Sequence, residues 1–186
     1  MQQVVFANGK LWGALDTALT LNSVNKAGIE WFIVKPSVSS SGVTGTIAKQ
    51  GYLGLANHNL TYPAIGVTTS GRGVMAFTLV DADNYPNAGY AAIDANVGVG
   101  DIHTAAAGLG PDDGFTSYKA FVGIPPRTRW GDYGAAVADG NSIWTASAYI
   151  GQTCTLAQYR SAPFGSCGGT RSSLGNWDTR ISKLTP

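Results

Sequence analysis

The sequence predicts an all-β fold, because its composition disfavours helices and its apolar runs are short and separated by turn signals. Among 186 residues the acidic side chains are ten Asp and a single Glu, although Glu is the better helix former of the two. Glycine is abundant at 25 residues, and the apolar runs are rich in Val, Ile, Thr and aromatic residues, which favour strands. No segment carries a helical apolar stripe longer than about two turns.

Three segments share one pattern, in which a short apolar strand is followed by a tight turn and a second strand that carries aromatic residues. They are Val4–Leu19, Ile65–Val80 and Ala135–Ile150. Their turns contain the dipeptides Asn8-Gly9, Ser70-Gly71 and Asp139-Gly140, which are typical of β-hairpins. The turn glycines lie 62 and 69 residues apart, and a repeat of this length is in the range of a large propeller blade.

Each hairpin is followed by further strand-like segments, so the repeats span approximately 1–62, 63–124 and 125–186. The additional strands are expected at Ile29–Lys35, Gly45–Leu55, Gly89–Asp94, Asp101–Ala107 and Thr179–Leu184. The third repeat has no candidate for a fourth strand. The sequence therefore predicts one domain over residues 1–186, built from about three antiparallel blade-like repeats of a β-propeller, with a β-sandwich as the alternative.

The number of repeats bears on the partners of the chain. A propeller usually closes with about four to eight blades, so three repeats leave two open ends. We expect the chain either to form a homo-oligomer, with two copies closing into a six-bladed ring, or to be part of a longer propeller. The formal net charge of +1 gives no electrostatic reason to expect nucleic acid, and no apolar run approaches the ~20 residues that span a bilayer.

The two cysteines indicate the compartment. Cys154 and Cys167 lie in a segment rich in Gly, Ser and Thr with no His nearby, whereas a zinc site needs about four ligands. We therefore expect a disulfide bond between them and an oxidising, extracellular location. The start of the chain runs straight into a strand-like segment at Val4 and lacks the pattern of a signal peptide, so the signal is expected to precede this sequence or to belong to a longer secreted chain.

A resemblance to a group of secreted bacterial proteins with propeller-like repeats is carried by several motifs. The C-terminal part of those proteins is similar to RWGDYGAAVADGNSIWTASAYIGQTCTL, starting at Arg129, and to CGGTR and NWDTRISKLTP. GRGVMAFTLVDADNYPNAGYAAID and DIHTAAAGLGPDDGF resemble them as well, so the similarity covers most of the chain from about Ile65. A departure is Asp178, where those proteins usually have Gly. The resemblance implies a propeller-like fold and secretion, and it implies no particular reaction.

Two groups of side chains are candidates for catalysis. On an extended strand Arg129 and Tyr133 project to one face and Asp132 to the other. Asp101 and His103 are two residues apart, so they share a strand face and could transfer a proton or ligate a metal. The alternative interpretations are that Arg129 pairs with a neighbouring Asp and that Asp101 and His103 are a surface pair without a catalytic role.

The segment Asp81–Asn87 has oxygen-bearing side chains at alternate positions, as calcium loops do. Asp81 and Asp83 are therefore weak candidates for calcium ligands, and a hydrogen-bonded turn is the alternative. The sequence Asp112-Asp113-Gly114 is a second acidic turn of the same kind. His58, in a polar loop, is expected to face solvent.

Two functions are consistent with these observations. The first is a secreted propeller-type module that binds a ligand such as a glycan, because the chain has no recognisable nucleophile motif and is poor in His and Glu. The second is an extracellular hydrolase that acts on a glycan, lactone or ester through Asp, His and Tyr residues at the propeller channel. The sequence leaves open whether the protein is an enzyme.

Overall fold

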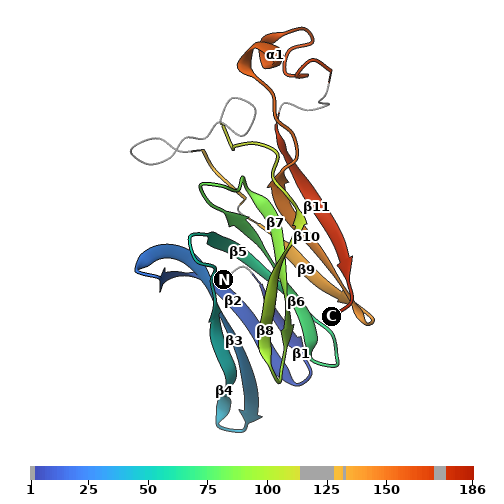
Figure 1. The fold of residues 1–186 in the computed structure, drawn as a ribbon. Helices are drawn as coiled ribbons and strands as arrows, with labels where there is room; N and C mark the ends of the chain where they lie inside the picture. Colours follow the sequence, from blue (N-terminus) through green and yellow to red (C-terminus); the bar gives the residue numbers. More distant parts are fainter. Residues whose placement is uncertain (1–2, 114–127, 132, 170–174) are drawn as a thin grey trace.

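The computed structural model describes residues 3–113, 128–131, 133–169 and 175–186, and this part of the chain is built mainly of antiparallel strands (Figure 1). Strands account for 62% of the described residues and helix for 3%, which confirms the predicted all-β class. The strands form three separate sheets, each containing one of the three predicted hairpins.

Each sheet is a meander whose strand order follows the chain. The N-terminal sheet contains β1 (Val4–Ala7), β2 (Lys10–Leu21), β3 (Val24–Ser39) and β4 (Gly42–Leu53). The middle sheet contains β5 (Asn59–Val67), β6 (Arg72–Val80), β7 (Asn87–Asp94) and β8 (Gly98–Ala106). The C-terminal sheet contains β9 (Ala135–Asp139), β10 (Ser142–Ile150) and β11 (Trp177–Leu184), so in the described residues it has three strands, as predicted.

The hairpin turns form where Asn and Gly residues can adopt the backbone conformation of a tight turn, as the sequence suggests. Asn8 and Gly9 both have positive φ, at 49° and 66°, which is the backbone that a two-residue hairpin turn requires. A further hairpin between β2 and β3, which the sequence analysis did not identify, turns at Asn22 and Ser23 with φ of 51° and 65°. Asn adopts this left-handed region more readily than most residues, so the Asn22 position is a signal that could have been used.

The sheets are stacked face to face, with the middle sheet between the other two (Figure 1). The first strands β1, β5 and β9 lie along one edge of the stack, while β4 contacts β8 and β8 contacts β11 at the opposite edge. This is a blade-like or sandwich-like arrangement of three layers.

Between the N-terminal and middle sheets lies the main apolar core, made by inward-facing residues of both. Its largest fully buried side chains are Trp12, Phe77, Ile29, Ile33, Leu60, Ile65, Met75 and Ile93. Because alternate residues of a strand point to opposite faces, the strand neighbours of Trp12, Ile29 and Ile33 form the outer face of the N-terminal sheet.

Close approach of the backbones characterises the other interface. Gly66 in β5 faces the C-terminal sheet, and a Cβ atom at this position would lie 2.9 Å from Ile143 Cγ2 and 3.1 Å from the Val137 backbone nitrogen. Glycine is therefore required for the two sheets to pack at this distance.

Candidate functional site

The outer face of the C-terminal sheet carries an open groove of about 470 Å³. The groove lies where the segment before β9 runs past β10 and the start of β11. Its lining residues are Arg129, Trp130, Gly131, Tyr133, Gly134, Ala135, Ala146, Ser147, Ala148, Trp177 and Thr179.

Side chains of β10 point alternately to its two faces, and this alternation explains why the outer surface is hollow. Thr145 and Ser147 are buried, whereas Ala146 and Ala148 are only partly buried and line the outer side of the strand. Their methyl groups leave a shallow apolar floor. Trp177 lies at the edge of this floor, because β11 pairs with β10 in a register that sets Thr179 opposite Ala148.

Three aromatic side chains line the groove, and they differ in exposure. Tyr133 is 84% exposed and Trp177 is 50% exposed, so both offer ring surface to a ligand. Trp130 is half-buried, and its Nε1 donates a hydrogen bond of 3.1 Å to Oγ1 of the buried Thr78 in β6. This bond fixes the indole of Trp130 and attaches the segment before β9 to the middle sheet.

The described lining of the groove contains one charged side chain, Arg129, and no carboxylate or imidazole. Aromatic rings around a small apolar floor, with a few hydroxyl groups nearby, are typical of binding sites for small organic ligands. Acid–base chemistry would need a titratable group in reach of the ligand. The predicted candidate Asp132 lies outside the described residues.

Asp101 and His103, the other predicted catalytic pair, are not in this groove. Both are exposed residues of β8, and the ring of His103 stacks on Tyr90 at 5.2 Å between centroids. Asp101 borders a different hollow of about 510 Å³, lined also by His58 and Asn84. The structure therefore does not bring Asp101 and His103 together with Arg129 and Tyr133.

The carboxylate of Asp81 is occupied by hydrogen bonds of its own turn. Oδ1 accepts from the backbone nitrogens of Asp83 at 2.7 Å and Asn84 at 2.9 Å, and Oδ2 accepts from Asn84 Nδ2 at 2.9 Å. His58 Nε2 lies 3.1 Å from the same Oδ2. Burial by itself would raise the pKa of Asp81, but the hydrogen bonds from Asp83 and Asn84 and the nearby His58 hold that pKa below its usual value.

These contacts correspond to the hydrogen-bonded turn that was the alternative to a calcium loop. Asp83 contributes its backbone N–H to the turn. Within the described ranges, no three or more His, Cys, Asp or Glu residues are placed to hold a metal ion together. His58, which was expected to face solvent, is only partly exposed, at 27%, because its Nε2 lies against the Asp81 carboxylate.

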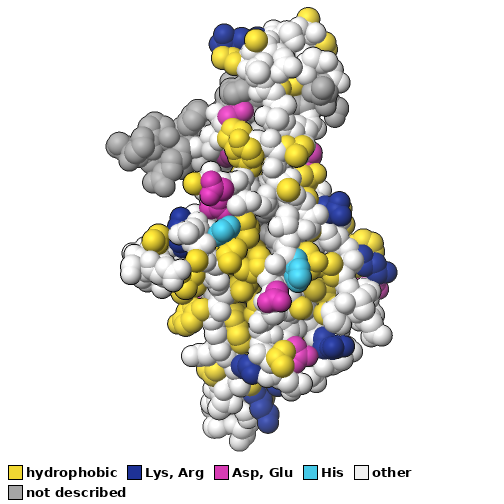
Figure 2. Space-filling view, viewed as in Figure 1, with side chains coloured by type: hydrophobic (Ala, Val, Ile, Leu, Met, Phe, Trp, Pro, Cys, Tyr) yellow, Lys and Arg dark blue, Asp and Glu magenta, His cyan; other side chains and the backbone are white. Residues whose placement is uncertain are grey.

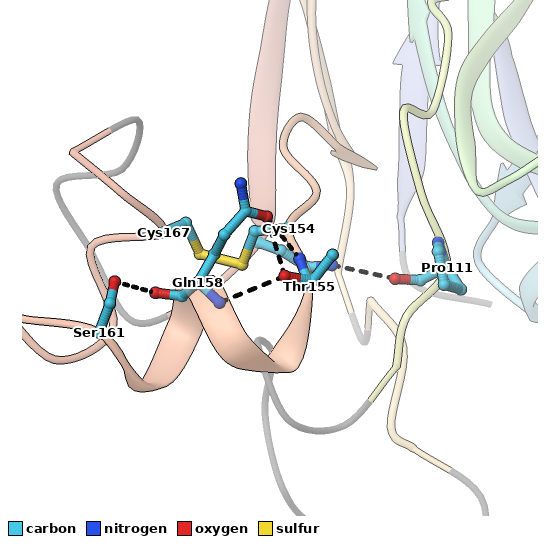
Figure 3. The surroundings of a disulfide bond; sticks show 7 residues. Pro111, Cys154, Thr155, Gln158, Ser161 and Cys167 are labelled. Carbon is cyan, nitrogen blue, oxygen red and sulfur yellow. Dashed lines mark hydrogen bonds between the residues drawn. A yellow bond between two sulfur atoms is a disulfide. The ribbon is translucent and has the colours of Figure 1, made fainter.

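The predicted disulfide bond is present between Cys154 and Cys167, with Cα atoms 5.7 Å apart (Figure 3). It closes a loop between β10 and β11 that contains the short helix α1 (Leu156–Arg160). The Thr155 hydroxyl accepts from the Gln158 backbone nitrogen and the Gln158 side chain accepts from the Thr155 nitrogen, which is a capping box. The pattern Thr-x-x-Gln in the sequence indicates the start of this helix, which was not predicted.

Trp177 and Trp130 are aromatic groove residues that were not among the predicted site residues. Trp177 belongs to the motif Asn-Trp-Asp, which was noted for its resemblance and not for chemistry. It lies two residues before the predicted strand Thr179–Leu184, and its 50% exposure could be known only from the packing of the sheet.

The fold and the groove define a class: an all-β protein of stacked antiparallel sheets, with one disulfide bond and an aromatic groove on an end sheet. Comparison with known proteins finds no matching family model, no similar curated protein and no similar solved structure. In the described part of the chain, no helix has the length and apolar character to cross a membrane.

Proposed function

We propose that this protein is a secreted, propeller-type module that binds carbohydrate in the aromatic groove of its C-terminal sheet. The observation that carries the proposal is the groove itself, in which Trp177, Tyr133 and Trp130 surround a floor of alanine methyl groups. The C–H faces of a sugar ring can pack on exposed aromatic rings, while the sugar hydroxyls remain in contact with water and with the exposed Thr179. The disulfide bond is consistent with an extracellular location.

The low net charge of the protein and its scattered charged side chains are consistent with an uncharged ligand. The chain has a formal net charge of +1, and Figure 2 shows basic and acidic side chains scattered over the visible face rather than gathered in one patch. A strongly charged partner would be expected to select a surface of opposite charge. The volume of about 470 Å³ lies within the range of ~300–1,000 Å³ that small-ligand sites occupy.

The hydrolase remains the second candidate, and the geometry supports it less well. A glycosidase commonly needs two carboxyl groups that face the scissile bond. Asp101 lies at another hollow, and the described lining of the groove contains no carboxylate. We therefore expect binding without turnover.

The binding test uses a panel of polysaccharides, namely cellulose, chitin, xylan and peptidoglycan, in pull-down and calorimetric formats. Trp177→Ala is expected to weaken binding of the retained polysaccharide at least tenfold while the melting temperature stays unchanged. Tyr85→Ala is the matched control, because Tyr85 is also a 50% exposed aromatic residue but does not line the groove. The proposal is wrong if the wild-type protein retains no member of the panel, or if both variants lose binding equally.

The hydrolase test measures release of reducing ends from the same panel. We expect no turnover in the wild type, and His103→Ala is expected to leave folding and sugar binding nearly intact. If the wild type hydrolyses a substrate and His103→Ala abolishes that activity at an unchanged melting temperature, the protein is an enzyme and not a binding module.

We also propose that two copies of the chain pair through their end sheets, which is how a three-layer stack could close into a ring. The outer face of the N-terminal sheet exposes apolar side chains, with Phe6 at 66%, Tyr52 at 62% and Ile47 at 56%. In the partner copy, the half of the C-terminal sheet away from the groove exposes Val137 and Ile181. Packing these faces together would continue the face-to-face stacking already present within the chain.

Charge complementarity supports this pairing. Glu30 lies on the outer face of β3, opposite Tyr52 of β4. Lys183 lies on the outer face of β11, with its ammonium 5.3 Å from the ring of Trp144. Light scattering is expected to give the mass of two chains, and Phe6→Asp is expected to give one. Val38→Asp, at a site that is 78% exposed near the β3–β4 turn, is the control and should remain dimeric. A monomeric wild type would exclude the pairing and would not affect the sugar proposal.

A further inference from the structure

Five buried side-chain oxygen atoms in or near the disulfide loop have no hydrogen-bond partner. One is Oγ of Ser166 within the loop, and the other four are Oδ1 and Oδ2 of Asp112, Oε1 of Gln152 and Oδ1 of Asn176. Buried polar atoms in proteins are almost always paired, and an ionised carboxylate is the group for which an unpaired burial costs most. Their accumulation in one region therefore needs a physical explanation.

Backbone and side-chain hydrogen bonds hold the segments that carry these oxygens side by side. Asn176 Nδ2 donates to the Pro111 carbonyl at 2.9 Å, which places the Asn176 side chain next to the residue before Asp112. The backbone nitrogen of Gln152 donates to the Asn176 carbonyl at 3.2 Å. Figure 3 shows Pro111 beside the disulfide loop, with a hydrogen bond reaching its carbonyl oxygen. Asp112, Gln152 and Asn176 thus come from three segments that meet at this point.

The orientation of the Asn176 amide is determined by its surroundings. Asn176 is 1% exposed, and the backbone oxygen of Pro111 can only accept a hydrogen bond, so the Nδ2 atom must face Pro111. The Oδ1 atom is consequently directed away from Pro111, without a donor. A buried amide oxygen fixed in this way is a ready ligand for a cation.

The chemistry of the donor set selects the kind of cation. The four unpaired atoms of Asp112, Gln152 and Asn176 are all oxygens, from one carboxylate and two amides, and this set contains no nitrogen or sulfur. Carboxylate and amide carbonyl oxygens are the ligands that Ca²⁺ prefers, whereas zinc and copper sites are built from imidazole and thiolate. A calcium ion would compensate the Asp112 charge and the two amide dipoles at once.

We propose that this protein binds a calcium ion through Asp112, Gln152 and Asn176. Since Ca²⁺ takes about six to eight oxygen ligands, water would complete the shell, and an affinity in the range of ~10⁻⁴–10⁻³ M, as in extracellular modules, is expected. The site uses the second acidic turn of the sequence and not the Asp81 turn, whose carboxylate is already occupied.

The position of this calcium site gives it a structural role next to the groove. Thr128 Oγ1 donates to the Asp112 carbonyl at 3.1 Å, and the chain continues from Thr128 directly to Arg129 and Trp130 of the groove. Asn176 directly precedes Trp177. The ion would thus fix the chain on both sides of the groove, and its binding does not depend on the proposed sugar ligand.

The test titrates the full chain, freed of metal with a chelator, with CaCl2 in a calorimeter and in thermal melts. We expect a saturable heat and a melting temperature about 3–8 °C higher at ~10 mM CaCl2, with a smaller effect of MgCl2. Asp112→Asn should lower the calcium affinity at least tenfold, and Asp83→Asn, the matched control in the other acidic turn, should bind as the wild type does.

A second variant covers the case in which Asp112→Asn does not fold. Gln152 is only half-buried, so Gln152→Met should fold and should weaken calcium binding several-fold. The proposal is overturned if the wild type shows neither heat nor a shift in melting temperature at 10 mM CaCl2, or if Gln152→Met and Asp83→Asn bind calcium equally well. Sugar binding that persists without calcium would leave the groove proposal intact.

Discussion

The two interfaces of the stack are built differently. Between the N-terminal and middle sheets, large apolar side chains fill the space, among them Trp12, Trp31 and Phe77. Between the middle and C-terminal sheets the buried apolar cluster consists of Ala64, Val74, Ala136 and Ile143. The first interface is stabilised by buried apolar volume, and the second by close approach of two backbones.

The C-terminal sheet, which has the smaller core, is also held by specific hydrogen bonds and by a disulfide bond within it. Gln3 reaches across the stack, donating from Nε2 to the Ala136 carbonyl at 2.7 Å and accepting from the Ala136 nitrogen at 3.3 Å. Trp130 bonds Thr78 of the middle sheet. The disulfide bond restrains the long connection between β10 and β11. The comparison teaches that one set of stacked sheets can be joined either by core packing or by close backbone approach with a few hydrogen bonds.

The largest expected effect is at the first interface. Trp12→Ala removes a fully buried indole and its hydrogen bond from Nε1 to the Ala7 carbonyl, so it should lower the free energy of unfolding by about 3–5 kcal/mol. Urea denaturation followed by far-UV circular dichroism measures this. Val38→Ala, on the exposed β3–β4 hairpin, is the control and should change stability by less than about 0.5 kcal/mol. Equal effects would contradict the packing described for this interface.

The next effect tests the covalent link of the C-terminal sheet. Replacing both cysteines, Cys154→Ser with Cys167→Ser, should lower stability by about 3 kcal/mol, because the open loop gains entropy in the unfolded chain. The wild type under reducing conditions should lose a similar amount in the same urea titration, and the reduced double variant should lose nothing further. If the double variant is as stable as the oxidised wild type, the C-terminal sheet does not depend on this link.

A smaller effect is expected from the close approach at Gly66. Gly66→Ala would place a methyl group against Ile143 and Val137, so it should cost about 1–3 kcal/mol by forcing the sheets apart. Gly100→Ala is the matched control, since a Cβ atom there meets only the Ala92 carbonyl at 3.8 Å. Scanning calorimetry of the two variants would distinguish them. A neutral Gly66→Ala would mean that the second interface is loosely packed.

The smallest expected effect depends on pH and concerns the polar edge of the first interface, where Asp81 meets His58. The native pKa of Asp81 is lowered from 3.8, so the ionised group stabilises the fold above that value, and this stabilisation is lost as the pH falls through the native pKa. Asp81→Asn should remove this part of the acid destabilisation. Melting temperatures would be measured between about pH 2.5 and pH 6, at intervals of about half a pH unit. They would show whether the melting temperatures of the wild type and the variant converge at low pH. Parallel curves would exclude the linkage.

Local features of the fold were predictable because they depend on neighbouring residues. Asn8-Gly9 and Asp139-Gly140 have the residue types that tight turns require, and the flanking strands follow from apolar runs. The disulfide bond followed from two cysteines in a segment without metal ligands. The helix α1 and the turn at Asn22 were missed although local signals for both are present in the sequence.

The candidate sites were predicted only in part, because they combine residues that are far apart in the chain. Arg129 and Tyr133 were singled out as site residues, but Trp177 joins them only through the pairing of β11 with β10. Likewise, Asp112 was recognised as part of an acidic turn, while its association with Asn176 depends on a bond to Pro111.

By itself, the sequence determined the class of the fold, the positions of three hairpins and the disulfide bond, since turn chemistry and side-chain alternation act over a few residues. The tertiary structure alone decided which faces became cores and which remained open. That decision rests on the volume of the buried side chains, with Trp12 and Phe77 in one interface, and Gly66 beside Ala136 in the other. Such volumes are matched only when strands that are distant in sequence stack against one another.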